Sequence, residues 1–345
     1  MQQKRRYGLD IIKILSTFMV CFYHLKIVNM GTFVEGQYIP SVGRLLTNFC
    51  AMSVPLFFMV NGAIMLRKSL TVKQVIWRFG KIVLLYAFWT NVIDIIADAV
   101  FRHTIDLSLN AFLTRGKYTA HLWYLLTLAI LTLLIPLINW CYKKNKLYIY
   151  IPFVLLLIFP FLYNYAIIGG ELGWIPFLAG KARTGLGTLY AFVYFVLGKV
   201  LTDIVEKKRE SHTKKIAVIS AVGCILGWIL VTFEGVFWTS VEGSVFDGVN
   251  SSFPTIGALL MAAGVFVLIE GYAPCEGGKA IAFFANNMLG IYIFHYIFTE
   301  KLEEVIGFNA PVLVAVLLTA LIIMITAVMA VICKKVPLLK NLLKI

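Results

Sequence analysis

The sequence predicts an all-α integral membrane protein, a bundle of about ten transmembrane helices with both termini in the cytoplasm. Of its 345 residues, 60% are hydrophobic and only 14% are charged, fractions that lie outside the averages of soluble domains. Apolar windows of about 20 residues, the length that spans a bilayer core, recur along the whole chain. Most of the 31 Lys and Arg residues fall in every second connection between these windows, and cytoplasmic loops are the ones enriched in such residues.

The apolar windows give the expected order of the spans. They lie near 9–30, 44–66, 79–101, 121–142, 147–168, 185–204, 215–234, 253–272, 280–299 and 310–333. An even number of spans puts both termini on one side of the membrane. No flexible linker, internal repeat or loop of soluble-domain size interrupts the series, so we expect one membrane domain over residues 1–345 of a multi-pass protein of the cell (plasma or inner) membrane.

The N-terminus resembles a secretory signal peptide, because basic residues precede an apolar run. Asp10 and Lys13 interrupt that run, and no A-x-A cleavage site follows. We therefore expect the first segment to be retained as a span.

The net charge of +14 does not predict nucleic-acid binding. That function needs basic residues clustered on a water-facing surface with aromatic side chains, whereas here the basic residues separate apolar segments. The six cysteines show neither CxxC spacing nor a disulfide framework. We interpret them as small core residues and expect no metal site.

The first window, YGLDIIKILSTFMVCFYHL, contains Asp10, Lys13 and His24. Lys13 and His24 are eleven positions apart, so on a helix they differ by about 20° and by about 16 Å along the axis. Thr17 falls between them on the same stripe. Because charge inside a bilayer is costly and usually faces a bundle interior or a wet cavity, we expect this stripe to line a cavity. The alternative is that Lys13 pairs with Asp10 at the headgroups and His24 only hydrogen-bonds a neighbouring helix.

Other polar residues group by depth in the predicted topology. His24, His121 and His295 fall towards the outer ends of their spans, whereas Lys13 and a further set of basic residues fall towards the cytoplasmic ends: Arg78, Lys81 and Lys199. The cations suit an anionic ligand that enters from the cytoplasm. Imidazole suits proton transfer at neutral pH. Each histidine alone is more often structural, and it is their convergence at one depth that favours catalysis.

Several segments, in this order, resemble signatures of the acyltransferase-3 family of integral membrane acyltransferases. Lys13 and His24 resemble the first-span pattern of a basic residue, ten further residues and a histidine, with Lys where Arg is commoner. Arg78-x-x-Lys81 resembles the basic pair that opens the third span. Asn61 stands where the second-span signature often has Ser. The other similar segments are GLDIIKIL, SVPLFFMVNGAIML, HLWYL, YFVLGK and GIYIFH.

This resemblance implies transfer of an acyl group, most often acetyl, from coenzyme A to a hydroxyl group of an envelope sugar or surface glycan. It implies that His24 is the catalytic base and that a basic cluster holds the phosphates of acyl-CoA. We therefore take the catalytic candidates to be His24, Lys13, Asp10, His121 and His295. The candidates for binding acetyl-CoA are Arg78, Lys81, Lys13 and Lys199. The axial offset of Lys13 and His24 is about half the hydrocarbon thickness, a length comparable to an extended pantetheine arm.

A secondary transporter or flippase of a glycan or lipid-linked sugar is the competing function, because intramembrane charge and a wet cavity also serve transport. A third possible function is that of a membrane sensor fragment of a larger enzyme. The roles of four acidic residues stay open. Asp94 is expected either to orient a histidine or balance a lysine in the bundle, or to lie with Asp98 near the outer headgroups. Glu270 and Glu300 lie near span ends, where interfacial solvation is favoured.

Overall fold

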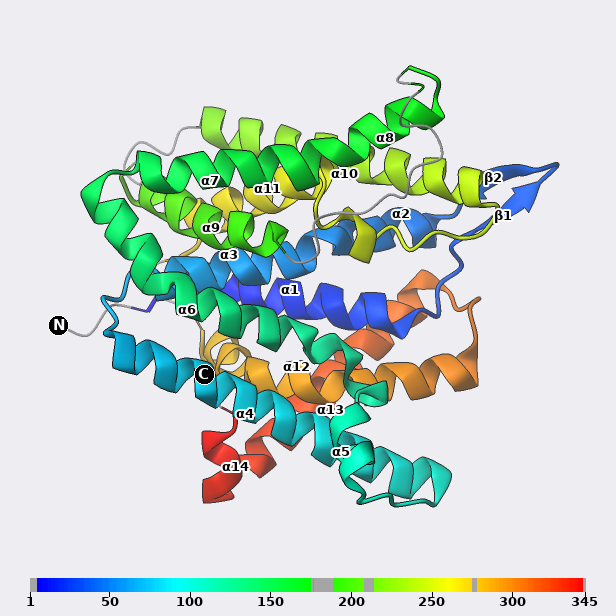
Figure 1. The fold of residues 1–345 in the computed structure, drawn as a ribbon. Helices are drawn as coiled ribbons and strands as arrows, with labels where there is room; N and C mark the ends of the chain where they lie inside the picture. The colour runs from blue at the N-terminus through cyan, green and yellow to red at the C-terminus, as the bar shows by residue number, and fades with distance from the viewer. Residues whose placement is uncertain (1–4, 175, 177–188, 208–213, 275–277, 344–345) are drawn as a thin grey trace. The chain divides into compact units, whose positions relative to one another are not determined.

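The computed structural model describes residues 5–174, 176, 189–207, 214–274 and 278–343. Most of these residues are helical (Figure 1). The α-helices are α1 Tyr7–Leu25, α2 Val42–Phe49, α3 Ser53–Met65, α4 Val72–Ala97, α5 Leu109–Thr114, α6 Trp123–Lys144, α7 Leu147–Leu157, α8 Tyr163–Glu171, α9 Tyr190–Lys207, α10 Lys214–Glu242, α11 Ile256–Tyr272, α12 Lys279–Ile306, α13 Val312–Cys333 and α14 Pro337–Asn341. Short 3-10 or π turns adjoin them: η1 Cys50–Met52, η2 Asp98–Arg102, η3 Lys117–Leu122, η4 Ile158–Leu162 and η7 Asn250–Ser252.

The fold is helical as expected, with one added element that the sequence analysis did not anticipate, a β-hairpin that follows α1. Strands β1 (Gly31–Val34) and β2 (Gln37–Pro40) pair antiparallel, with Val34 opposite Gln37. Glu35 and Gly36 between them have φ angles of 50° and 81°. Positive φ at both positions is the backbone of a type I′ turn, whose twist matches that of the two strands. A search for windows of span length does not detect such short strands.

Each expected span coincides with a helix or a run of helices. Among the described residues, seven segments are long and apolar enough to cross a membrane by length and composition: Tyr7–Leu25, Val42–Met65, Val72–Arg102, Lys117–Lys144, Lys214–Glu242, Lys279–Ile306 and Val312–Cys333. The window 147–168 contains α7 and α8, and the window 253–272 contains the 17-residue α11. The window 185–204 begins outside the described residues and continues as α9, which carries charged side chains along its second half. The count of ten and the cytoplasmic placement of both termini stay predictions.

Two long helices carry rows of exposed apolar side chains. On α10 these are Val218, Ile219, Val222, Ile225, Leu226 and Ile229. On α13 they are Leu313, Leu317, Leu321, Met324, Val328 and Ile332. Large contiguous apolar surfaces are unusual on soluble proteins and mark interaction or membrane-facing surfaces. Together with the span lengths, they identify a helical membrane protein.

Contacts along the backbone group the chain into two compact units. The first unit comprises Met1–Ser16, Met30–Ser69 and Leu137–Gly278, and the second unit comprises Thr17–Asn29, Leu70–Pro136 and Lys279–Ile345. Helices α1 and α6 each contribute residues to both. The assignment of residues 1–345 to a single membrane domain stays a prediction.

The first unit is built around two closely packed helix pairs. Between α3 and α9, a Cβ atom at Gly62 would overlap the carbonyl group of Phe195, and one at Gly198 would overlap that of Met59. Gly227 and Gly257 allow the same close approach between α10 and α11. Small residues at helix contacts let backbones approach in membrane proteins, which explains why the segments SVPLFFMVNGAIML and YFVLGK both contain a glycine.

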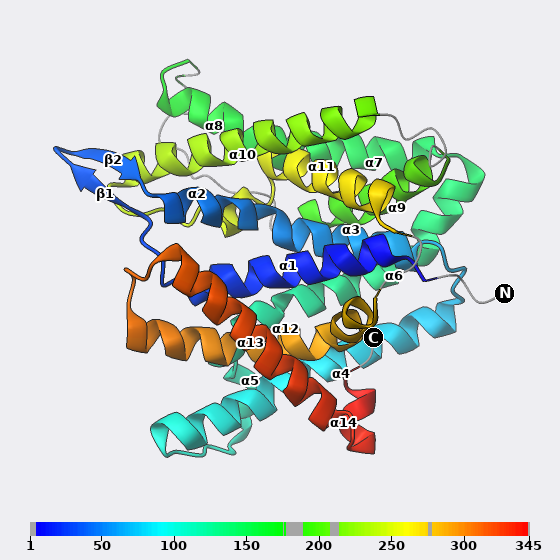
Figure 2. The ribbon, with the colours of Figure 1, turned by 180° about the vertical axis from the view of Figure 1, so that it is seen from behind.

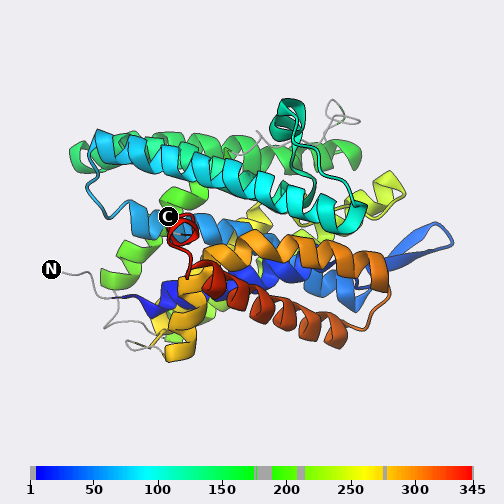
Figure 3. The ribbon, with the colours of Figure 1, turned by 90° about the horizontal axis from the view of Figure 1, so that it is seen from below.

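The second unit is organised around α12, which lies beside α13 (Figures 2 and 3). Gly290 of α12 faces the side chain of Ala330 in α13. Helix α4 packs on η3 and on α12, and the indole Nε1 of Trp89 in α4 donates to the carbonyl of Leu342 at 3.0 Å. This packing fixes the elements that carry the candidate histidines.

The cysteines agree with their interpretation as core residues for the most part. Cys21, Cys50 and Cys141 are buried, and Cys224 and Cys333 are half-buried. Cys275 lies outside the described residues.

Candidate functional site

Three histidines from three elements meet within the second unit. His24 lies at the end of α1, His121 in η3 and His295 in α12. The ring centroids of His121 and His295 are 4.8 Å apart, those of His24 and His295 are 5.6 Å apart, and those of His24 and His121 are 6.3 Å apart. His121 and His295 are buried, whereas His24 is half-buried. The structure thus brings together the three side chains that the sequence placed at one depth.

The position of His24 is set by the chain that follows it. Helix α1 ends at Leu25, and the chain continues to Ile27, whose carbonyl accepts a hydrogen bond from the backbone N–H of Ala310 at 2.9 Å. The side chain of Asn29 donates to that of Asn309 at 3.0 Å. These contacts hold the end of α1 against the segment that joins α12 to α13.

The position of His121 depends on Asp94 of α4. The Asp94 carboxylate accepts hydrogen bonds from the backbone N–H groups of Gly116, Lys117 and Tyr118 at 2.7, 3.0 and 3.1 Å. It is 3% exposed. Asp94 therefore holds the first turn of η3, the element that carries His121. Asp94 thus acts on the position of a histidine, one of the expectations for it, but does so through backbone N–H groups, which a carboxylate in an apolar run does not reveal.

One backbone carbonyl fixes the tautomers of the two buried histidines. His121 Nε2 and His295 Nδ1 lie 2.9 and 2.8 Å from the carbonyl oxygen of Tyr292. A carbonyl oxygen only accepts, so both nitrogens donate. In the neutral rings His121 Nδ1 and His295 Nε2 then carry lone pairs, and both atoms are buried with no hydrogen-bond partner among the described residues. Each can accept a proton or a hydrogen bond.

Two tyrosines of α12, which the sequence analysis did not single out, complete this cluster. The Tyr296 ring stacks on His121 with centroids 4.9 Å apart and meets His24 at 5.0 Å. The Tyr292 hydroxyl donates to the backbone carbonyl of His121. The sequence signal that could have identified both tyrosines was their closeness to His295 in GIYIFHYIF. Tyr292 lies one turn before His295 on the same helix face.

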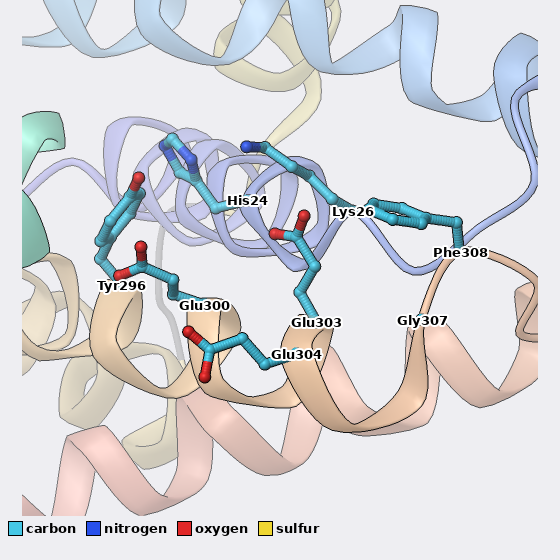
Figure 4. Close-up of a pocket in the computed structure, with 8 residues that line it drawn as sticks. All are labelled: His24, Lys26, Tyr296, Glu300, Glu303, Glu304, Gly307 and Phe308. Carbon is cyan, nitrogen blue, oxygen red and sulfur yellow. The ribbon is translucent and has the colours of Figure 1, made fainter. Parts of the chain in front are cut away.

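His24 also lines a cavity of about 400 Å³ in the second unit. Figure 4 shows the residues around it: His24, Lys26, Tyr296, Glu300, Glu303, Glu304, Gly307 and Phe308. A ligand in this cavity reaches the His24 imidazole directly. His24 therefore combines access to a ligand with contact to two buried imidazoles.

Asp10 and Lys13 belong to the first unit and form ion pairs. Asp10 is buried and accepts from Arg5 Nε at 2.5 Å, and Lys13 Nζ lies 3.4 Å from its other carboxylate oxygen. The pairing required by the alternative interpretation of the first span is therefore present. The catalytic role of either residue stays a prediction.

The other basic candidates are divided between the units. Arg78 and Lys81 lie half-buried on α4 in the second unit, with Lys81 Nζ 5.3 Å from the Trp77 ring centroid. Lys199 on α9 belongs to the first unit, pairs with Asp203 and lies 5.8 Å from the Tyr142 ring centroid. Arg and Lys suit phosphate binding, and a shared phosphate site stays a prediction.

The expectation for Glu270 is wrong. Glu270 is not solvated but 5% exposed, and Arg6 Nε donates to its carboxylate at 2.6 Å. Arg6 also pairs with Glu206. The physical reason is that a guanidinium distant in sequence compensates the buried charge. Glu300 is half-buried and lines the cavity.

The histidine cluster is not arranged as a metal centre. Within the described part of the chain, no group of three or more His, Cys, Asp or Glu side chains is placed to hold a metal ion. The chemistry available to the cluster is proton transfer by imidazole.

The arrangement of a ligand-accessible histidine in a helical membrane protein agrees with the comparison to known families. A family model described as an acyltransferase domain matches residues 6–332, nearly the whole chain. The chain belongs to the acyltransferase-3 family. No curated protein and no solved structure matches it. The matched range contains every signature segment from GLDIIKIL to GIYIFH, so the resemblance noted in the sequence is confirmed.

Membership of the acyltransferase-3 family identifies a membrane acyltransferase. It favours an enzyme over the transporter alternative. It also places His24, His121 and His295 inside the matched domain.

Proposed function

We propose that this acyltransferase moves an acyl group, most often acetyl, from cytoplasmic acyl-CoA to a hydroxyl group of an envelope sugar or surface glycan on the outer face. The observation that carries the proposal is the position of His24, which lines a cavity and contacts His121 and His295. An alcohol is a poor nucleophile at neutral pH and needs a positioned base. His24 is that base.

In the proposed reaction, a ring nitrogen of His24 takes the proton of the acceptor hydroxyl as its oxygen attacks the thioester carbonyl. The C–S bond then breaks, an ester forms, and the His24 imidazolium returns the proton to the leaving thiolate of coenzyme A. The Lys26 ammonium and the Tyr296 hydroxyl line the same cavity. Both are hydrogen-bond donors of the kind that stabilise negative charge developing on an attacked carbonyl oxygen.

The donor is proposed to bind through Arg78, Lys81, Lys13 and Lys199, because guanidinium forks and ammonium groups are the side chains that bind phosphates. With the predicted topology, these cations face the cytoplasm and the histidines face outward. The acyl group then crosses the membrane along the protein, and the polysaccharide is modified outside.

Oriented proteoliposomes test the proposal. Acetyl-CoA supplied on the N-terminal side is expected to acylate a membrane-impermeant sugar on the opposite side, measured by mass spectrometry of the sugar and by release of free coenzyme A. Folded protein that neither releases coenzyme A nor acylates any sugar would contradict the enzyme assignment, and sugar uptake without acylation would favour a transporter.

Sidedness is tested in the same vesicles. Acylation that occurs only when donor and sugar share the N-terminal compartment would overturn the transmembrane path while leaving the acyltransferase assignment intact. Comparing the envelope glycans of strains with and without the protein by mass spectrometry then identifies the acceptor and the added mass together.

A further inference from the structure

The cavity beside His24 is formed by two segments of the second unit. The end of α1 supplies His24, the segment after it supplies Lys26, and the C-terminal part of α12 with the turn after it supplies the other lining residues. A parallel β-bridge between Val28 and Ala310 joins the two segments. The volume of about 400 Å³ lies at the lower end of the range of roughly 300–1,000 Å³ for small-molecule sites. It suits a small ligand or one unit of a longer one.

The lining carries charges of both signs. Glu300, Glu303 and Glu304 lie three and four residues apart on α12, so they share one helix face. Lys26 faces them from the segment after α1, and the Tyr296 hydroxyl lies beside His24 (Figure 4). The charge of Glu304 is balanced by Lys301, whose Nζ lies 2.6 Å from its carboxylate.

Two further observations indicate that these groups serve a ligand. Glu300 Oε2 is buried and makes no hydrogen bond within the described residues, and the same holds for Nε2 of the fully buried His295 that contacts His24. Lys26 has a left-handed backbone with φ of 49°. Helices usually place glycine or asparagine in that conformation after their last turn.

The two signs of charge restrict what binds. An anionic ligand is repelled by Glu300 and Glu303, which outnumber the one ammonium group of Lys26 in the lining. The phosphates of coenzyme A are therefore unsuited to this cavity. Hydroxyl groups suit it, because each can donate to a carboxylate and accept from an ammonium or a phenol. The rings of Tyr296 and Phe308 offer apolar surface for the C–H groups of a sugar ring.

We propose that this cavity is the acceptor subsite and that it selects an uncharged polyhydroxyl acceptor over acceptors bearing a carboxylate. Glu300 and Glu303 accept hydrogen bonds from acceptor hydroxyls, and Lys26 donates to an acceptor oxygen, so that one hydroxyl lies against the His24 imidazole. The assignment of this ligand as the acceptor rests on the proposed function. The charge selectivity rests on the lining alone.

Binding of three small glycosides to the full chain in detergent, without any acyl donor, tests the subsite. The probes are methyl glucoside, methyl glucuronide and methyl glucosaminide, which share a ring and differ in charge. By calorimetry or ligand-observed NMR, the neutral glycoside is expected to bind at least about tenfold more tightly than the glucuronide, and the glucosaminide is expected to bind no more weakly than the neutral glycoside. Glu300→Gln and Glu303→Gln are each expected to weaken it by about tenfold, as for loss of a hydrogen bond to a charged group.

Glu35→Gln in the exposed hairpin turn is the matched control and is expected to bind like the wild type. Glu303→Lys is expected to shift the preference towards the glucuronide by about tenfold or more, a gain that misfolding cannot produce. Tighter binding of the glucuronide than of the neutral glycoside by the wild type, unchanged affinity in both glutamine variants, or no binding of any of the three by folded protein would each overturn the proposal.

The two proposals fail separately. Absence of acyl transfer from acetyl-CoA overturns the proposed function, while the glycoside measurements continue to test the charge selectivity. Acyl transfer that proceeds unchanged in Glu300→Gln and Glu303→Gln overturns the acceptor subsite and leaves the acyltransferase standing.

Discussion

Two buried carboxylates of the first unit and two buried histidines of the second unit differ in how they are compensated. In the first unit, Asp10 and Glu270 each accept from an arginine, at 2.5 Å from Arg5 and 2.6 Å from Arg6. In the second unit, His121 and His295 each keep one ring nitrogen that has no hydrogen-bond partner among the described residues.

This difference separates a structural role from a chemical one. A buried charge costs free energy unless it is paired, and Asp10 and Glu270 each pair with an arginine. A buried imidazole nitrogen with a lone pair, next to a residue that lines a cavity, remains available to a proton. Burial of a polar group therefore does not identify a site until its partners are known. Asp10, Lys13 and His24 share one helix, yet the structure engages the first two in an ion pair and places the third at a cavity.

The largest expected effect is that of His24→Ala. Losing a general base lowers the rate by roughly 10²–10⁴-fold, so acyl transfer is expected to fall by that factor while the protein still inserts and folds. The measurement is the turnover of acetyl-CoA by purified protein with a matched thermal unfolding curve. Near-normal turnover would remove His24 from the mechanism.

Variants at other histidines show whether the loss of rate is specific to His24. His103→Asn is the matched control, because His103 is exposed with φ of 54° and asparagine tolerates that conformation. His121→Ala and His295→Ala are expected to be milder or to alter the use of the acceptor. Equal losses in all three variants would contradict the distinction drawn between the cavity-lining histidine and the two buried ones.

The paired groups of the first unit are expected to affect stability instead of rate. Glu270→Gln removes the negative charge that pairs with Arg6, and breaking a buried ion pair costs about 3 kcal/mol or more. The free energy of unfolding in detergent is expected to fall by about 3 kcal/mol, with kcat unchanged at temperatures where the variant is folded. Loss of turnover at unchanged stability would assign Glu270 to the reaction. It would contradict the distinction between structural groups in the first unit and catalytic groups in the second unit.

The smallest expected effect concerns the basic candidates. Arg78→Gln and Lys81→Gln are each expected to weaken coenzyme A binding by about tenfold, through loss of a contact to phosphate. The difference from wild type is expected to shrink as salt screens the contact. Lys199→Gln is expected to have less effect, because its ammonium already pairs with Asp203. Calorimetry on folded variants provides the measurement.

The alternative role of Arg78 and Lys81 is topological, since basic residues at the cytoplasmic ends of spans also set orientation. Unchanged affinity in both single variants and in the double variant would favour that role. In that case, other basic side chains would bind the phosphates of the acyl donor.

The sequence by itself determined the properties that depend on local composition. Hydropathy and helix periodicity identified a helical membrane protein and the helix containing each candidate histidine, because apolar length and the position of a residue on a helix follow from neighbours within a few turns. The order of weak motifs also identified the family. The hairpin was missed because its strands are much shorter than the windows that detect spans.

Only the tertiary structure decided which polar groups meet. The carbonyl of Tyr292 binds His121 from a position 171 residues away, Arg6 reaches Glu270 across 264 residues, and Asp94 caps a turn that begins 22 residues later. Helix periodicity gives the face of a residue but not the helix that packs against it. That choice is made by packing between helices, where a glycine such as Gly290 admits a neighbour that a larger side chain would exclude. The partners of Asp94, Glu270 and the three histidines therefore exist only in the folded chain.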